Sequence, residues 1–126
     1  ETKRSEREKQ LEKEEKESER CDLARTLATL AEKHSDFAAA DAVLHTMRTD
    51  KSVEVRRTAA AYLAFSTKRP REPISVHVVK GMYDALDDED QTVRFYAAES
   101  VNGSIREADG LAIDQSIQPQ VKGQLG

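Results

Sequence analysis

The chain has 126 residues, of which 35% are charged and only 5% aromatic, and its net charge at pH 7 is −4. This length suits one domain, and the low content of glycine and proline favours helices over a β-rich fold. A weakly acidic chain exerts no general attraction on nucleic acid or anionic lipid, so we expect no nucleic-acid partner. Because no apolar run is long enough to span a bilayer and no secretory signal is present, we expect no membrane insertion.

Cysteine and histidine give no sign of a metal site. Cys21 is the only cysteine, which excludes a disulfide framework and a cysteine-rich metal site, and a lone thiol suits the reducing cytoplasm. The three histidines, His34, His45 and His77, are scattered and form no HExxH motif. We therefore expect no cofactor, no metal and no catalytic residue. The sequence begins at Glu1 instead of Met, as a fragment or a processed chain would.

Residues 1–21 form a charged segment that we interpret as a helical extension. Its first 20 residues contain seven Lys or Arg and eight Glu, with no apolar stripe that could dock on a core. From residue 22 the composition changes, and an apolar face predicts an amphipathic helix over residues 22–33 that continues the charged helix. Three leucines form this face and three alanines widen it: Leu23, Leu27, Leu30, Ala24, Ala28 and Ala31.

Apolar residues recur at helical spacing in four further segments, which we predict to be helices over residues 37–48, 53–67, 74–86 and 91–106. Asp36 is a candidate N-cap for the first of them. The predicted buried stripes are Phe37, Ala40, Leu44 and Met47; then Val55, Ala59 and Leu63; then Ile74, Val78, Met82 and Leu86; and finally Val93, Ala97, Val101 and Ile105.

Three features bear on where these elements end. Valines at 76, 78 and 79 leave a strand open as an alternative for residues 74–86, although helix fits the pattern better. Pro70 and Pro73 predict a loop after the second helix. Gly103 weakens the end of the last helix, and Gly110 is the expected stop. We interpret residues 109–126, which are rich in Gly and Gln, as a tail or linker.

An internal repeat joins two of these segments. The stretch from Asp50 to Ala60 matches the stretch from Asp88 to Ala98, 38 residues later, in the pattern Asp, four residues, Val-Arg, two residues, Ala-Ala. Each Asp precedes a helix and can accept backbone N–H groups, each Val begins a buried stripe, and each Arg can bridge to an Asp of the adjacent unit. The motif residues are Asp50, Val55, Arg56 and Ala59, and Asp88, Val93, Arg94 and Ala97.

This pattern resembles the HEAT-repeat family, whose units are helical hairpins with Asp and Val-Arg at this spacing. The resemblance implies an all-α fold, a short right-handed α-solenoid of HEAT-like hairpins in residues 22–108 with the charged helix at its N-terminal end. It implies that residues 37–48 and 74–86 are outer helices and that residues 52–67 and 91–106 are inner ones, with residues 22–33 as a cap. Val93–Val101 also resembles a stretch in the HEAT-repeat scaffold of the PIKfyve phosphoinositide-kinase complex.

We infer from the repeat a non-catalytic scaffold that binds another protein or a further copy of the chain. The alternatives are a nucleic-acid-binding helical repeat and a repeat-type lyase or hydroxylase. On the helical wheel one set of polar and aromatic residues points away from the last buried stripe, and Lys68, Arg69 and Arg71 form a basic loop with Arg56 and Arg57 one helix away. The candidate protein-binding residues are Arg57, Lys68, Arg69, Arg71, Phe95, Glu99, Asn102 and Arg106.

Overall fold

The computed structural model describes residues 5–69 and 71–112, with side chains described as far as Gly103, and this part of the chain is all-α, as predicted. Valines 76, 78 and 79 lie in a helix, so the alternative of a strand there is wrong. The elements in chain order are α1 (Glu6–His34), α2 (Phe37–Thr49), α3 (Val53–Phe65), α4 (Pro73–Met82), the 3-10 helix η1 (Tyr83–Ala85) and α5 (Gln91–Ala112).

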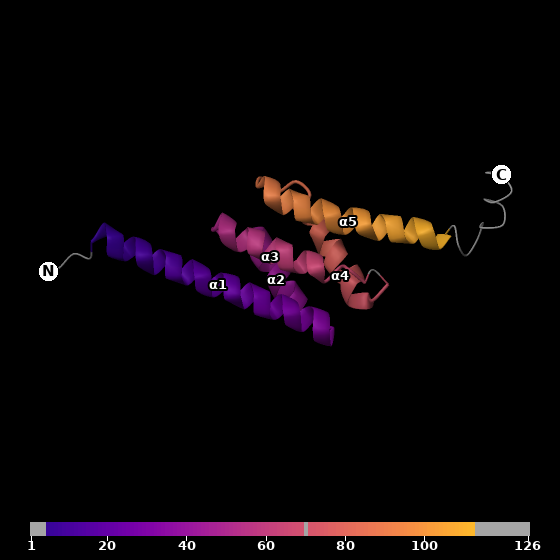
Figure 1. Ribbon diagram of the computed structural model, residues 1–126, viewed down its shortest axis with the longest axis horizontal. Helices are drawn as coiled ribbons and strands as arrows, with labels where there is room; N and C mark the ends of the chain where they lie inside the picture. The colour runs from indigo at the N-terminus through magenta and orange to yellow at the C-terminus, as the bar shows by residue number, and fades with distance from the viewer. Residues whose placement is uncertain (1–4, 70, 113–126) are drawn as a thin grey trace.

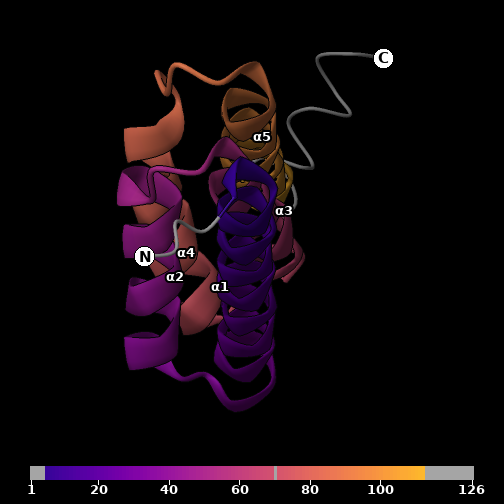
Figure 2. The ribbon, with the colours of Figure 1, turned by 90° about the vertical axis from the view of Figure 1, so that its left-hand side faces the viewer.

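The helices form two layers. α1, α3 and α5 lie side by side and run in the same direction, and α2 and α4 form a second layer behind them (Figures 1 and 2). Within the first layer α3 packs against both α1 and α5, and in the second layer α2 packs against α4. The chain therefore alternates between the layers, and the projecting N-terminal half of α1 extends beyond the second layer.

The charged extension and the first amphipathic segment form one continuous helix, so the boundary predicted after residue 21 falls inside α1. Ser5 begins α1 with a capping box, in which the Ser5 hydroxyl accepts from the Glu8 amide and the Glu8 carboxylate accepts from the Ser5 amide. His34 and Ser35 end α1, and Ser35 takes a left-handed conformation with φ of 51°. Glu and Lys are strong helix formers, which explains why the charged half remains helical.

The buried face of α1 consists of its alanines and differs from the predicted leucine face. Ala24, Ala28 and Ala31 are buried, whereas Leu23 is 57% exposed and Leu30 is 38% exposed. Alanines allow α3 to approach closely, and the Thr58 hydroxyl lies 3.5 Å from the Cys21 sulfur. A leucine facing α3 would hold the two helices apart. The prediction that the leucines form the centre of the buried stripe is therefore wrong for Leu23 and Leu30, whereas Leu27 is partly buried and packs against the core.

Local sequence explains the starts of the remaining helices. The Asp36 carboxylate caps α2 by accepting from the Ala39 amide, which confirms the predicted cap. Pro73 occupies the first turn of α4, where its missing N–H leaves no intrahelical bond unmade. The segment predicted to be one helix over residues 74–86 is α4 followed by η1, and Leu86 is 37% exposed outside both.

Most of the predicted buried stripes lie in one core between the two layers. Val55, Ala59 and Leu63 of α3 are fully buried, as are Val93 and Ala97 of α5. The core also takes in Ala40, Val43, Leu44 and Met47 of α2, Ile74, Val78 and Met82 of α4, and Val101 of α5. Phe37 departs from its predicted place, because it is 40% exposed and packs against the His77 ring at 4.8 Å.

One glycine matters for the packing of the second layer. A Cβ atom added at Gly81 of α4 would lie 2.6 Å from the Leu44 side chain of α2, so the missing side chain permits the close approach of these helices.

Gly110 does not end the last helix, because α5 continues to Ala112, and the predicted stop is wrong. Residues 113–126 of the predicted tail lie outside the described part of the chain. No helix within that part has the length and apolar character needed to cross a membrane.

Candidate functional site

The two halves of the internal repeat have the same geometry. Asp50 accepts from the Ser52 amide at 2.9 Å, and Asp88 accepts from the Asp90 amide at 2.8 Å. The Arg56 guanidinium donates to the Asp50 carbonyl at 3.0 Å, and the Arg94 guanidinium donates to the Asp88 carbonyl at 2.6 Å. The segments that begin at Asp50 and at Asp88 are thus equivalent turns that fix the start of α3 and of α5.

The helix caps themselves lie two residues beyond the repeated aspartates. The Ser52 hydroxyl accepts from the Val55 amide at 3.3 Å, and the Asp90 carboxylate accepts from the Val93 amide at 3.0 Å. The repeated aspartates accept backbone amides as predicted, but they hold the capping residues in place and do not cap the helices themselves. The sequence pattern did not single out these caps, because Ser52 and Asp90 differ in residue type.

Arginine–aspartate pairs link each helix of the first layer to the next turn. Arg20 of α1 forms a two-point contact with Asp50, at 2.9 and 3.1 Å. Arg57 of α3 donates to Asp90 through Nε and Nη2, with a shortest distance of 2.8 Å. Arg56 also lies 3.8 Å from Asp88 of the following turn, which confirms the predicted bridge between units. Through Arg20, α1 takes part in the same pattern as the repeat, which the sequence did not reveal.

These pairs shift the pKa values of their aspartates. Hydrogen bonds from Arg57 hold the pKa of Asp90 at about 2, below its ordinary 3.8, and the Val93 amide adds to the effect. Burial alone would raise the pKa of Asp50, but the hydrogen bonds from Arg20 and the Ser52 amide outweigh it and lower that pKa. Both carboxylates are therefore held in the charged form that their partners require.

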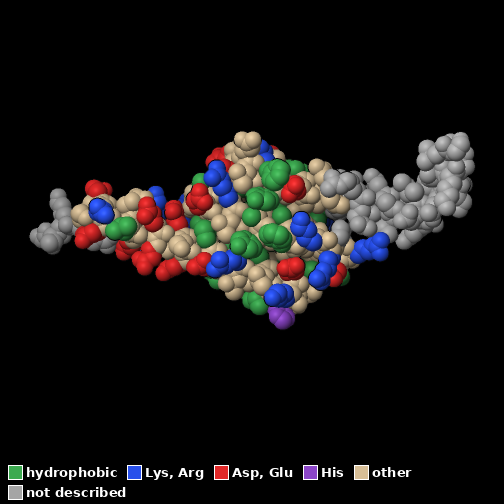
Figure 3. Space-filling view, viewed as in Figure 1, with side chains coloured by type: hydrophobic (Ala, Val, Ile, Leu, Met, Phe, Trp, Pro, Cys, Tyr) green, Lys and Arg blue, Asp and Glu red, His purple; other side chains and the backbone are tan. Residues whose placement is uncertain are grey.

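Two phenylalanines of the first layer are exposed. Phe65 is 55% exposed and Phe95 is 54% exposed. Each lies near a tyrosine of its own helix: the ring centroids of Phe65 and Tyr62 are 6.2 Å apart, and those of Phe95 and Tyr96 are 5.4 Å apart. Hydrophobic side chains gather in the middle of one face of the molecule, across α3 and the beginning of α5 (Figure 3). We refer to these two pairs together as the aromatic surface; Tyr62 and Phe65 line a groove that α3 forms with α1, and Phe95 and Tyr96 lie on α5. The sequence singled out Phe95, but it missed Phe65.

The other candidates of the first layer differ in their surroundings. Glu99 and Asn102 are exposed on α5, as predicted. Arg57 is 40% exposed, and its guanidinium is held by Asp90 and lies 3.6 Å from Glu54. It is thus a partly exposed cation that two carboxylates hold in place. Arg106 lies in α5, but its side chain is outside the described part of the structure.

The basic loop does not join the arginines of α3. Lys68, Arg69 and Arg71 are exposed beyond the C-terminal end of α3, whereas Arg56 and Arg57 lie in its first turns. The backbone separation is roughly 16 Å at the rise of an α-helix. Lys68 instead lies 5.8 Å from the Phe65 ring centre, where its ammonium group faces the aromatic surface. Arg69 is 3.6 Å from Glu72.

The histidines do not converge. His77 lies 2.6 Å from Asp41 on the second layer, while His34 and His45 are exposed elsewhere. Among the described residues, no three His, Cys, Asp or Glu side chains are grouped so that they could hold a metal ion.

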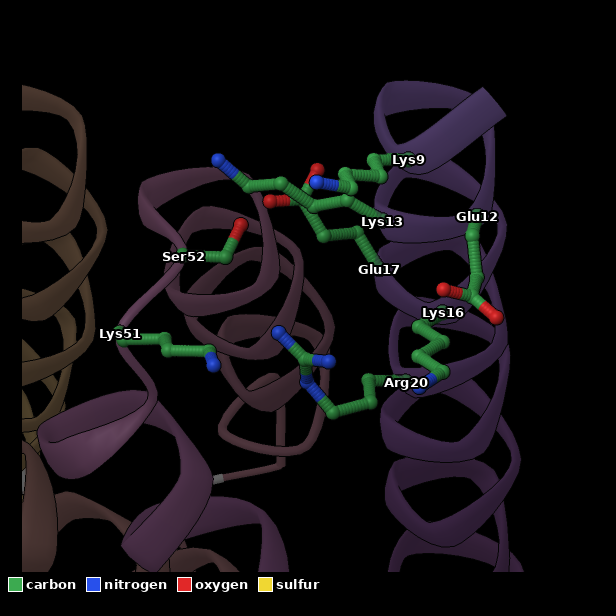
Figure 4. Close-up of a pocket in the computed structure, with 8 residues that line it drawn as sticks. All are labelled: Lys9, Glu12, Lys13, Lys16, Glu17, Arg20, Lys51 and Ser52. Carbon is green, nitrogen blue, oxygen red and sulfur yellow. The ribbon is translucent and has the colours of Figure 1, made fainter. Parts of the chain in front are cut away.

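A cavity of about 430 Å³ lies between α1 and the start of α3, and the sequence pattern did not predict it. Figure 4 shows side chains from α1 and from the turn before α3 extending into the space between the two elements. Its lining consists of Lys9, Glu12, Lys13, Lys16, Glu17, Arg20, Lys51 and Ser52. The spacing of the basic residues of α1 could have indicated one basic face, but Lys51 joins them only through the tertiary fold.

Comparison with protein-family models, with curated proteins and with solved structures finds no match to this chain. The functional assignment therefore depends on the geometry of the chain itself.

Proposed function

We propose that the protein is a non-catalytic scaffold of HEAT-type repeats, a short α-solenoid that binds partner proteins in the cytoplasm. Three observations support the repeat assignment: the equivalent turns at Asp50 and Asp88, the parallel stacking of α1, α3 and α5, and the arginine–aspartate pairs between successive elements. In such a stack each hairpin buries its core against its neighbours and leaves one broad face free for binding.

The observation that carries the binding function is the aromatic surface. Phe65 and Phe95 are more than half exposed, although a phenylalanine that served only the core of this fold would be buried. Exposed aromatic side chains supply much of the binding energy at protein interfaces. Arg57 of the same layer is held by Asp90, and an anchored arginine loses little conformational entropy when it meets a carboxylate of a partner.

Replacing Phe65 and Phe95 together with alanine should abolish most binding while leaving the fold intact. Peptides selected from a random display library on the wild-type protein should bind the Phe65→Ala/Phe95→Ala variant at least about tenfold more weakly, because interface aromatics are the usual hot spots. Fluorescence anisotropy with the selected peptides measures the affinity, and circular dichroism checks that the helices are retained.

A Val76→Ala/Tyr83→Ala variant serves as the matched control, because these side chains are 43% and 51% exposed but lie on α4 and η1. Its affinity for the same peptides should equal that of the wild type. If the two variants bind equally well, or if no peptide is enriched on the wild type, the aromatic surface is not a protein-binding face.

A further inference from the structure

The cavity between α1 and α3 concentrates positive charge on an acidic protein. Four lysines and an arginine line it against two glutamates, whereas the whole chain carries −4. We refer to these lining residues as the basic cavity. Like charges repel when they are brought together, so a cluster of this kind favours the binding of an anion.

Positive charge exceeds negative charge among the residues that line the cavity. Arg20 is held by Asp50 at 2.9 Å, and Lys9 lies 3.7 Å from Glu6. Lys13, Lys16 and Lys51, by contrast, form no ion pair with any residue that the structure describes. These three ammonium groups are available as donors to a ligand, and Asp50 fixes the position of the Arg20 guanidinium.

The two sides of the basic cavity come from different parts of the chain. Figure 4 shows Lys9 and Lys13 extending from α1 toward the start of α3, and Lys51 extending from the opposite side toward Arg20. Ser52, which caps α3, also lines the cavity and is 8% exposed. The amides of the first turn of α3 add partial positive charge on that side. A ligand there would be surrounded by donors from more than one direction.

The composition of the lining indicates the class of ligand. It contains no aromatic and no large aliphatic side chain, so an acidic peptide would find no apolar anchor there and a nucleic-acid base no stacking partner. The volume of about 430 Å³ is that of a small-molecule site. We propose that the basic cavity binds a compact anion with two or more adjacent phosphate groups, either free in solution or carried by a lipid headgroup.

Pyrophosphate is the probe for this proposal. Isothermal titration calorimetry at low salt should show one pyrophosphate per wild-type chain and at least about tenfold weaker binding of orthophosphate, which offers fewer charge-assisted contacts. A Lys13→Gln/Lys51→Gln variant, which keeps Arg20 and its bond to Asp50, should bind pyrophosphate at least about tenfold more weakly. Circular dichroism should be unchanged, because both lysines are exposed.

A Lys33→Gln/Lys80→Gln variant loses the same charge from exposed positions outside the basic cavity, and its affinity for pyrophosphate should stay within about twofold of wild type. Co-sedimentation with phosphatidylcholine vesicles that contain diacylglycerol pyrophosphate, a lipid whose headgroup is a pyrophosphate, distinguishes the two phosphate sources. Retention that is lost in the Lys13→Gln/Lys51→Gln variant indicates lipid-borne phosphate, and pyrophosphate binding without retention indicates a soluble anion. The proposal is overturned if wild type does not bind pyrophosphate, if orthophosphate binds equally well, or if both variants weaken binding equally.

Discussion

Replacing Leu63 with alanine should lower the free energy of unfolding by about 2–5 kcal/mol, which is the range for a leucine truncated in a packed core. Leu63 is fully buried between the two layers, so its loss leaves a cavity that the surrounding helices can only partly fill. Urea denaturation followed by circular dichroism at the helical band measures the change, and the unfolding midpoint should fall with little change in slope.

Leu23→Ala is the matched comparison, because it makes the same chemical change at a leucine that is 57% exposed. Its effect on the free energy of unfolding should stay within about 0.5 kcal/mol, as for most surface substitutions. A loss at Leu23 as large as that at Leu63 would show that the leucines of α1, and not its alanines, face the core.

Replacing Asp90 with alanine should lower the free energy of unfolding by about 2–3 kcal/mol near neutral pH. The substitution removes the N-cap of α5, worth about 1 kcal/mol, and the paired charge of Arg57. The pKa of Asp90 is about 2 when folded and 3.8 ordinarily. This lowered pKa stabilises the folded state. Since Arg57 is 40% exposed, solvent screening reduces its contribution to the free energy of unfolding to about 1–2 kcal/mol.

The charge contribution can be separated from the cap by pH. Because folding lowers the pKa of Asp90, its contribution is nearly complete above about pH 4 and is lost as the pH falls through the folded pKa of about 2. Asp90→Asn keeps a capping oxygen but not the charge, so it should be less stable than wild type at pH 6, and the difference should be mostly lost at pH 2. A stability difference that persists unchanged at pH 2 would mean that the ion pair is not its source.

The sequence was most informative where chemistry repeats at a fixed spacing. Asp50 and Asp88 occupy the same kind of turn, and Arg56 and Arg94 donate to equivalent carbonyls, because the local pattern contains both donor and acceptor. The existence of each helix also followed from local periodicity. The end predicted at Gly110 failed, since a single glycine costs only about 1 kcal/mol in a helix.

Faces and sites that depend on packing were harder to predict. On a helical wheel of α1, Leu27 and Ala28 belong to the same apolar face. The alanines form the buried part of that face because α3 packs closely against them, and this packing cannot be read from the sequence. The basic cavity requires Lys51 to lie near residues that precede it by more than 30 positions, which no local pattern encodes. Phe65 was missed for a related reason, because its exposure depends on where α3 ends and the chain turns away.

The position of α3 has a consequence for motion. α3 is covered by α1 on one side and α5 on the other, whereas each of those helices has α3 as its neighbour within the layer. Local opening can therefore begin by detaching either end of the row, and it reaches α3 only after a flanking helix has separated. Amide protons of α3 should accordingly be the slowest to exchange with solvent. Phe65 therefore belongs to the helix that we expect to unfold last.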